Sequence, residues 1–288
     1  MTELDWHDGT ERWTERDGVR LHYVEGGREE PDAPTVLFVH GLTSSARSWD
    51  PVVPRIAAGC HVVSVDLRGH GDSGWAGKIP DGYRTLEFAR DLMHIVRTIG
   101  RGRVHVVGHS LGARIGIVLA GESPDLVQTL ILSDTLPEVA PEGAVYIKQM
   151  IGDRTGTTAY RTVEEVVEVI AREDPNWQKG QYEHYVRSNL VTNWVGKLIY
   201  RCDPQLYWIT TGRASRADNG YFWEAAGKIE CPTLILWGRR SFLVNQELVD
   251  RMLATTTSAR DRAFDTGHYI LREAPEEWTD EVLRHIGV

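Results

Sequence analysis

The sequence predicts an α/β protein with a mostly parallel central sheet, helices on both faces and one helical insertion. Short apolar runs rich in Val, Ile and Leu recur along the chain, as expected for central strands covered on both faces. Segments of helical periodicity separate these runs, and such alternation is typical of a doubly wound sheet. One long segment without a buried-strand signal interrupts it. A chain of 288 residues is long enough for one large domain that carries such an insertion.

The first predicted strand, residues 19–25 (VRLHYVE), alternates between apolar and polar side chains, as a half-buried strand does. The other predicted strands are residues 35–39, 61–65, 104–107, 130–132, 234–237 and 260–264. The predicted helices of the same domain are residues 83–99, 111–120, 246–253 and 276–286.

Between Asp134 and Ile229 the chain shows only helix-like stretches, such as residues 163–171 and 181–198. This segment contains 12 of the 25 aromatic residues, seven of them tyrosines. The sequence therefore predicts a core domain of residues 1–135 and 230–288 and a helical cap of residues 136–229. The cap aromatics form a small core of their own, and some of them also enclose a substrate cavity above the sheet.

Composition excludes several classes of protein. A net charge of −9 disfavours nucleic-acid binding, which requires clustered Lys and Arg. No apolar run approaches the roughly 18 residues of a membrane span, and the first residues lack the apolar stretch of a secretory signal. The three cysteines show no metal-binding spacing. We expect a cytoplasmic protein that acts on a small molecule, without metal or cofactor; the sequence does not indicate an oligomeric state.

The strongest motif is Gly-His-Ser-Leu-Gly at residues 108–112, between a predicted strand and a predicted helix. In this context the serine occupies a tight, strained turn, and its hydroxyl points toward substrate. The flanking glycines avoid a clash where strand and helix approach each other closely. The sequence therefore predicts that Ser110 is a catalytic nucleophile.

A serine hydroxyl needs a nearby base. Of the 11 histidines, His268 has the right position, because it follows the predicted last strand in a glycine-containing loop before the C-terminal helix. From the carboxyl edge of the sheet it can reach Ser110. We expect His268 to be the general base.

His40-Gly41-Leu42 follows the strand of residues 35–39. The glycine allows the loop to turn so that the backbone N–H of Leu42 faces the reacting carbonyl. The N–H of Leu111 is the predicted second donor, and two such donors form an oxyanion hole.

Together these motifs resemble the α/β-hydrolase superfamily, and in particular its cap-bearing esterases, lactonases and carbon–carbon bond hydrolases. The resemblance covers nearly the whole chain and includes HGL, DLRGHGDS at residues 66–73, GHSLG, PTLILWG at residues 232–238 and the late Gly-His. It implies an α/β-hydrolase fold and the chain order serine, acid, histidine. It also implies that DLRGHGDS is mainly a structural turn, so we assign it no catalytic role.

The sequence departs from the family pattern at the third member of the catalytic triad. The acid usually follows the strand in PTLILWG, but this position is occupied by Ser241. Some members place it after the preceding strand, where this chain has Asp134. We therefore predict Asp134 as the acid. The structural alternative is that its side chain only hydrogen-bonds the backbone where the chain leaves the strand. Asp250, Asp265 and a triad without a carboxylate remain further alternatives.

These residues predict a serine hydrolase that cleaves a carboxylic ester or lactone through an acyl-enzyme on Ser110. Cleavage of a carbon–carbon bond beside a ketone is the nearest alternative, and a ligand receptor or pseudoenzyme with this fold is another. We expect Trp194 and Trp208 of the cap, and Val244 after the strand of residues 234–237, to contact the substrate.

Overall fold

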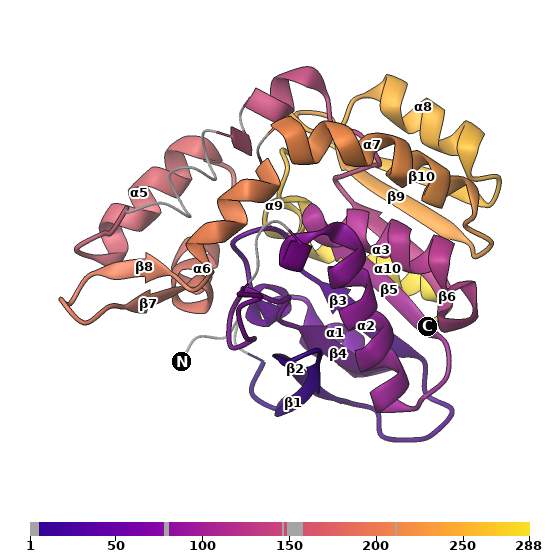
Figure 1. The fold of residues 1–288 in the computed structure, drawn as a ribbon, viewed down its shortest axis with the longest axis horizontal. Coiled ribbons are helices and arrows are strands. Elements are labelled where there is room, and N and C mark those ends of the chain that lie inside the picture. The colour runs from indigo at the N-terminus through magenta and orange to yellow at the C-terminus, as the bar shows by residue number, and fades with distance from the viewer. Residues whose placement is uncertain (1–5, 78–80, 146, 149–157, 211) are drawn as a thin grey trace.

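The computed structural model describes residues 6–77, 81–145, 147–148, 158–210 and 212–288 (Figure 1). An eight-stranded sheet runs through the molecule in the order β1-β2-β4-β3-β5-β6-β9-β10. These strands are β1 (Thr10–Arg16), β2 (Val19–Gly27), β3 (Thr35–Val39), β4 (His61–Val65), β5 (Val104–His109), β6 (Val127–Ser133), β9 (Thr233–Gly238) and β10 (Ala259–Phe264). The six strands from β4 to β10 are parallel, whereas β1 and β2 form an antiparallel hairpin at one edge.

Helices cover both faces of this sheet. They are α1 (Val53–Ala57), α2 (Thr85–Ile99), α3 (Leu111–Glu122), α8 (Gln246–Thr255), α9 (Ile270–Glu273) and α10 (Pro275–Ile286). Alternate strand residues face opposite sides: Leu37 and Val39 pack with α2 and α3, whereas Val36 and Phe38 pack with α1 and α10. The predicted fold class is therefore confirmed.

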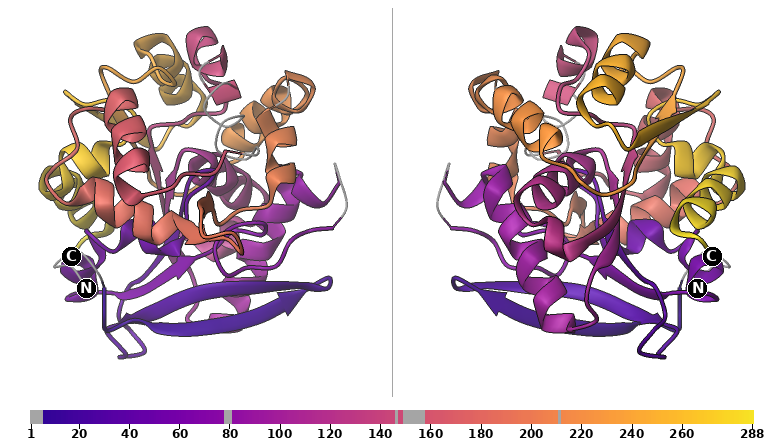
Figure 2. Two further views of the ribbon diagram at one scale, coloured as in Figure 1. Left: turned by 90° about the vertical axis from the view of Figure 1, so that its left-hand side faces the viewer. Right: turned by 90° about the vertical axis from the view of Figure 1, so that its right-hand side faces the viewer.

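The seven predicted strands all form, and β1 is an additional strand that the sequence did not predict. Its sequence, TERWTER, is mostly polar, and most of its side chains are exposed. An edge strand that contributes little to the core carries no apolar run by which to recognise it. Figure 2 shows the hairpin of β1 and β2 along one end of the molecule.

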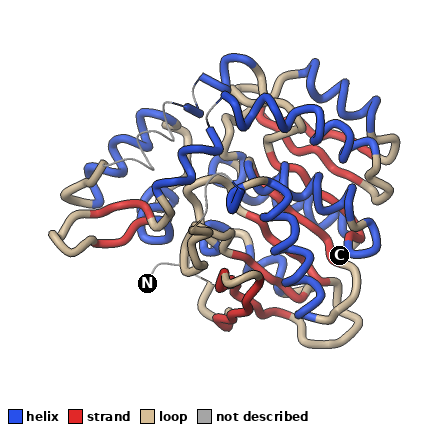
Figure 3. Tube along the Cα trace, in the orientation of Figure 1, coloured by secondary structure: helices blue, strands red, loops and turns tan. Residues whose placement is uncertain are grey.

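The inserted segment contains α5 (Val163–Glu173), α6 (Gln181–Asn189), β7 (Leu190–Thr192), β8 (Leu198–Tyr200), the 3-10 helix η4 (Pro204–Thr210) and α7 (Gly212–Gly227). The prediction of a helix through residue 198 is wrong, because α6 ends at Asn189 and a two-stranded antiparallel hairpin follows (Figure 3). The hairpin turn places Gly196 at φ 79°, a conformation that favours glycine.

The last helix of the predicted cap range belongs spatially to the core. α7 lies against α3, and a Cβ on Gly121 of α3 would stand 2.4 Å from the carbonyl oxygen of Ala225 (Figure 1). Glycine at this position allows the two helices to approach closely. The elements that project from the core are α5, α6, β7 and β8 (Figure 1).

Hydrogen bonds join the inserted segment to two core loops. Ser45 Oγ donates to the carbonyl oxygen of Ser188 at the end of α6 (2.9 Å). In the loop after β4, the N–H of Gly71 donates to the carbonyl oxygen of Arg201 (2.9 Å), and Gly69 accepts from the N–H of Asp203 (2.8 Å). The inserted segment is therefore held beside the loops that follow β3 and β4.

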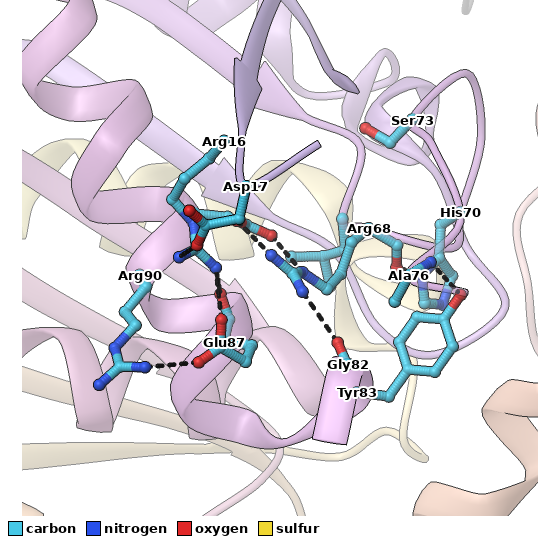
Figure 4. A network of polar contacts seen from close by, with 12 residues as sticks. Arg16, Asp17, Arg68, His70, Ser73, Ala76, Gly82, Tyr83, Glu87 and Arg90 are labelled. Carbon is cyan, nitrogen blue, oxygen red and sulfur yellow. Dashed lines mark hydrogen bonds and ion pairs between the residues drawn. The ribbon is translucent and has the colours of Figure 1, made fainter. Parts of the chain in front are cut away.

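The loop after β4 is itself fixed by a buried polar network (Figure 4). Arg68 donates to both carboxylate oxygens of Asp91 (2.5 and 2.7 Å) and to the carbonyl oxygen of Gly82 (2.9 Å). The hydroxyl of Tyr83 accepts from the N–H of Ala76 (3.1 Å) and donates to Asp203 (2.6 Å). These contacts give the DLRGHGDS segment the structural role that the resemblance implied.

No helix that the structure describes is both long and apolar enough to cross a membrane.

Candidate active site

Ser110 lies between β5 and α3 with φ 53° and ψ −119°. A non-glycine residue in this region is strained, and such strain is typical of functional positions. The flanking glycines are sterically required, because a Cβ on Gly108 would lie 2.4 Å from the carbonyl oxygen of Gly112, and one on Gly112 would lie 2.0 Å from that of Val39. The turn thus presents the Ser110 hydroxyl at the carboxyl edge of the sheet.

His268 and Asp134 come together at the same edge. His268 Nδ1 lies 2.7 Å from Asp134 Oδ2, and both side chains are buried. Asp134 follows β6, the neighbour of β5, and its backbone has a positive φ of 53°. Asp tolerates this conformation better than most residues do. The distance is the one that a histidine-orienting carboxylate requires.

Ser241 faces Asp134. Its hydroxyl donates to Asp134 Oδ2 (2.5 Å) and accepts from the N–H of Leu243 (3.0 Å). The N–H of Gly238 donates to the other carboxylate oxygen (2.8 Å). Together with His268, three donors satisfy a carboxylate that is fully buried, as a buried charge requires. Ser241 therefore supports the carboxylate from the position where the family usually has its acid.

The predicted oxyanion donors are held by their surroundings. The N–H of Leu67 donates to His40 Nε2 (3.1 Å), so the other ring nitrogen carries the proton and donates to the carbonyl oxygen of Gly41 (2.7 Å). Burial lowers the pKa of His40, which favours this neutral form. In a trans peptide, the Leu42 N–H points away from the Gly41 carbonyl that His40 binds.

The second donor belongs to a helix end. Leu111 is the first residue of α3, and the first N–H groups of a helix have no partner within the helix. Both Leu42 and Leu111 line the same cavity as Ser110 and His268.

His109 fixes the backbone of the histidine loop. Its Nε2 donates to the carbonyl oxygen of His268 (3.1 Å), and the two rings lie with centroids 4.6 Å apart. Burial and the neighbouring His268 hold the pKa of His109 well below its ordinary value. A neutral His109 can therefore support His268 without placing a second charge beside it.

A cavity of about 100 Å³ opens over Ser110 and His268. Most of its described lining is apolar, contributed by Leu42, Leu111, Val139, Ile147, Ile209, Phe242 and Leu243. Arg114, one helical turn after Ser110, also lines it and donates to the carbonyl oxygens of Leu136 (3.2 Å) and Pro137 (3.1 Å). This lining favours a small, largely apolar substrate.

The three predicted substrate contacts lie elsewhere. Trp194, in the turn between β7 and β8, is 95% exposed, because the predicted helix there is a projecting hairpin. Val244 is buried in the main core, and Trp208 in η4 is not among the described lining residues. Their neighbours Ile209, Phe242 and Leu243 line the cavity instead. The sequence pointed to the correct two segments, but not to the side chains that face inward.

We expect Trp194→Ala to change kcat/KM less than twofold, because the side chain contacts solvent. Ile209→Ala should lower kcat/KM for substrates that fill the cavity by about tenfold, the effect of losing apolar contact in a pocket. Kinetics on a series of acyl chain lengths would measure both. Equal losses in the two variants would contradict the position assigned to the cavity.

One group of side chains in the described part of the chain could hold a cation: His22, Asp66 and Asp72, with ligand atoms within 4.8 Å of one another. Asp66 already accepts from His22 Nδ1 (2.7 Å) and from the N–H groups of Ala46 and Asp72. Burial alone would lower the pKa of His22, but hydrogen bonds to Asp66 and Glu11 raise it. The imidazole of His22 thus lies between Asp66 and Glu11, and Asp66 already has three hydrogen-bond donors from the protein.

This fold, with a serine, a histidine and a carboxylate at one edge of the sheet, is typical of hydrolases. Comparison with known proteins identifies the family. Residues 34–275 match the family model described as alpha/beta hydrolase fold. The chain belongs to this family.

Individual relatives share between a quarter and a third of their aligned residues with this chain. The chain is 32% identical over 149 residues to a 2-(acetamidomethylene)succinate hydrolase of Mesorhizobium japonicum, and the match spans about half (52%) of each chain. It is 28% identical over 249 residues to a 3-hydroxybutyrate-oligomer hydrolase of Cupriavidus necator, with 82% of each covered. The crystal structure of an E-2-(acetamidomethylene)succinate hydrolase superposes with a TM-score of 0.85 at 25% identity, covering 97% of this chain and 100% of that one. These matches support the hydrolase class.

Proposed function

We propose that this chain is a serine hydrolase that cleaves a carboxylic ester or lactone of a small molecule through an acyl-enzyme on Ser110. The observation that carries the proposal is the contact between His268 Nδ1 and the buried carboxylate of Asp134. His268 lines the same cavity as Ser110, whose backbone is strained. The naming of its relatives as hydrolases supports hydrolysis as the reaction.

In the first half of the proposed reaction, His268 Nε2 takes the proton of the Ser110 hydroxyl while Ser110 Oγ attacks the substrate carbonyl. The N–H groups of Leu42 and Leu111 donate to the resulting oxyanion, and each such donor contributes about 3 kcal/mol. Asp134 holds the imidazole in the required tautomer and stabilises the imidazolium. Collapse of the intermediate breaks the ester bond, and His268 returns the proton to the leaving alkoxide.

In the second half, His268 removes a proton from a water molecule that attacks the acyl-enzyme. The same oxyanion donors stabilise the second intermediate. Breakdown releases the carboxylic acid, and the proton returns to Ser110 Oγ. The four roles are thus distributed over loops that follow β3, β5, β6 and β10 at one edge of the sheet.

A fluorophosphonate probe should label one residue per chain, Ser110, in the peptide that contains residues 108–112. Mass spectrometry would locate the label, and Ser110→Ala should abolish it. Wild-type protein should also hydrolyse p-nitrophenyl esters with a burst of p-nitrophenol if the acyl-enzyme accumulates. Labelling at another serine, or binding of ligands without any turnover, would contradict the proposal.

A further inference from the structure

A second, smaller cavity of about 10 Å³ adjoins the first. The two cavities share Gly41, Ser44, His109 and Tyr269, so the smaller one lies next to the cavity that contains Ser110. Its size suits a single water molecule or a single carboxylate oxygen. Most of the residues that line it carry a polar side-chain group, and one of these groups is charged.

That charged side chain is Arg272 of α9, which is only 2% exposed. Its Nη1 donates to Gln181 Oε1 (3.1 Å) and to the Gln181 carbonyl oxygen (3.4 Å). The guanidinium lies 4.8 Å from the ring centroid of Trp177 and 5.1 Å from that of Tyr185. All these partners are neutral, and none of the ion pairs among the described residues includes Arg272.

Such a cation is unusual inside a protein. Burial lowers the pKa of Arg272 to about 10, while electrostatic interactions with Tyr185, Tyr269 and the carboxylate of Asp174 act in the opposite direction, and the side chain stays charged at neutral pH. A buried charge is normally paired with an opposite one, because its removal from water is unfavourable. The two aromatic rings offset part of this through cation–π contacts. An anion in the adjoining cavity would complete the pairing.

Trp49 supplies an independent observation at the same cavity. It is 1% exposed and packs beside Phe38 and Trp278, yet its Nε1–H has no hydrogen-bond partner among the described residues. Buried indole N–H groups usually find an acceptor. The hydroxyl-bearing Ser44 and Ser48 line the same space. Residues that carry an indole N–H, a guanidinium and two hydroxyls thus line a space sized for one oxygen.

We propose that this small cavity binds a carboxylate of the substrate, with one carboxylate oxygen between Arg272 and Trp49. The inference rests on the proposed function and specifies its substrate class: an ester or lactone that carries a free carboxylate in addition to the carbonyl that Ser110 attacks. The carboxylate forms a direct ion pair with Arg272, and Trp49 donates a second hydrogen bond. The shared residues, Gly41 and His109 among them, connect this subsite to the reacting centre.

The first test compares monoethyl succinate, glutarate and adipate with ethyl esters of the monocarboxylic acids of equal length. We expect wild-type protein to prefer at least one of the carboxylate-bearing esters in kcat/KM. Arg272→Gln should reduce that preference by at least tenfold, and Arg272→Lys should restore part of it. Arg55→Gln is the matched control, since it removes one exposed positive charge far from either lining. No preference in the wild type, or a preference unchanged by Arg272→Gln, would overturn the proposal.

A binding experiment separates this proposal from the proposed function, because it needs no turnover. In the Ser110→Ala background, calorimetry with succinate, glutarate and adipate should show binding of at least one dianion, weakened at least tenfold by Arg272→Gln but unaffected by Arg55→Gln. Binding of chloride with no dicarboxylate binding would overturn the proposal. If circular dichroism shows that Arg272→Gln does not fold, Trp49→Phe is tested instead. This variant removes the indole N–H and should weaken dicarboxylate binding about threefold. Unchanged binding would count against the subsite.

Discussion

The Asp134→Asn variant is expected to keep its fold and lose about 10³–10⁴ in kcat, the loss known when a triad carboxylate becomes an amide. An asparagine is nearly isosteric with aspartate, but its NH₂ group cannot accept from His268 Nδ1–H. The imidazole then favours the tautomer whose Nε2 carries a proton and cannot act as base toward Ser110. Steady-state kinetics on an activated ester would measure the loss, and circular dichroism would verify the fold.

Variants at Ser241 provide the control. Ser241→Ala should lower kcat less than about tenfold, because Asp134 retains His268 and Gly238 as donors. Ser241→Asp should not raise kcat, since a second carboxylate beside Asp134 Oδ2 adds like-charge repulsion. If Ser241→Asp instead raised kcat by orders of magnitude while Asp134→Asn changed little, the acid would belong at position 241.

Ser110→Ala should show the largest effect, a loss of about 10⁶ in kcat as in serine proteases that lose their nucleophile. Residues that act as one unit are strongly non-additive. The double variant Ser110→Ala, Asp134→Asn should therefore be no slower than Ser110→Ala alone. A sensitive fluorogenic ester and active-site titration to exclude wild-type contamination are needed for the measurement. A further loss of 10³ in the double variant would show that Asp134 acts outside the Ser110 mechanism.

The parts of the fold that the sequence predicted are those with a strong local signal. Buried parallel strands such as β3 and β4 are continuous apolar runs, and every residue of both is buried. The parts that the sequence analysis missed lack this signal. β1 is an exposed edge strand, and β7 and β8 have three residues each, too few for a pattern of alternation to appear.

The candidate site could be predicted where topology determines the position of a residue. Ser110, Asp134 and His268 each follow a parallel strand, and the carboxyl ends of β5, β6, β9 and β10 meet at one edge of the sheet. Side chains of the cap follow no such rule. Whether Trp208 or its neighbour Ile209 faces the cavity depends on the rotation of η4, which tertiary packing determines.

The buried Arg272 shows another limit of sequence reasoning. From the sequence of Ile270–Glu273 alone, Arg272 would be expected on the surface, as a residue in the last turn of a helix. It is covered by a distant segment of the chain, through Trp177, Gln181 and Tyr185. When a distant segment forms the environment of a cation, the residues around the cation in the sequence do not indicate that it is buried.

The position of Asp134, immediately before the cap, has a consequence for protein engineering. All three proposed triad residues and both oxyanion donors lie outside residues 136–229, as do Ser241 and Gly238, which support the carboxylate. The segment between Leu136 and η4, which includes the cavity-lining Val139 and Ile147 and the projecting elements α5 to β8, could therefore be exchanged for that of another family member. Such chimeras would inherit their chemistry from one parent and part of their selectivity from the other.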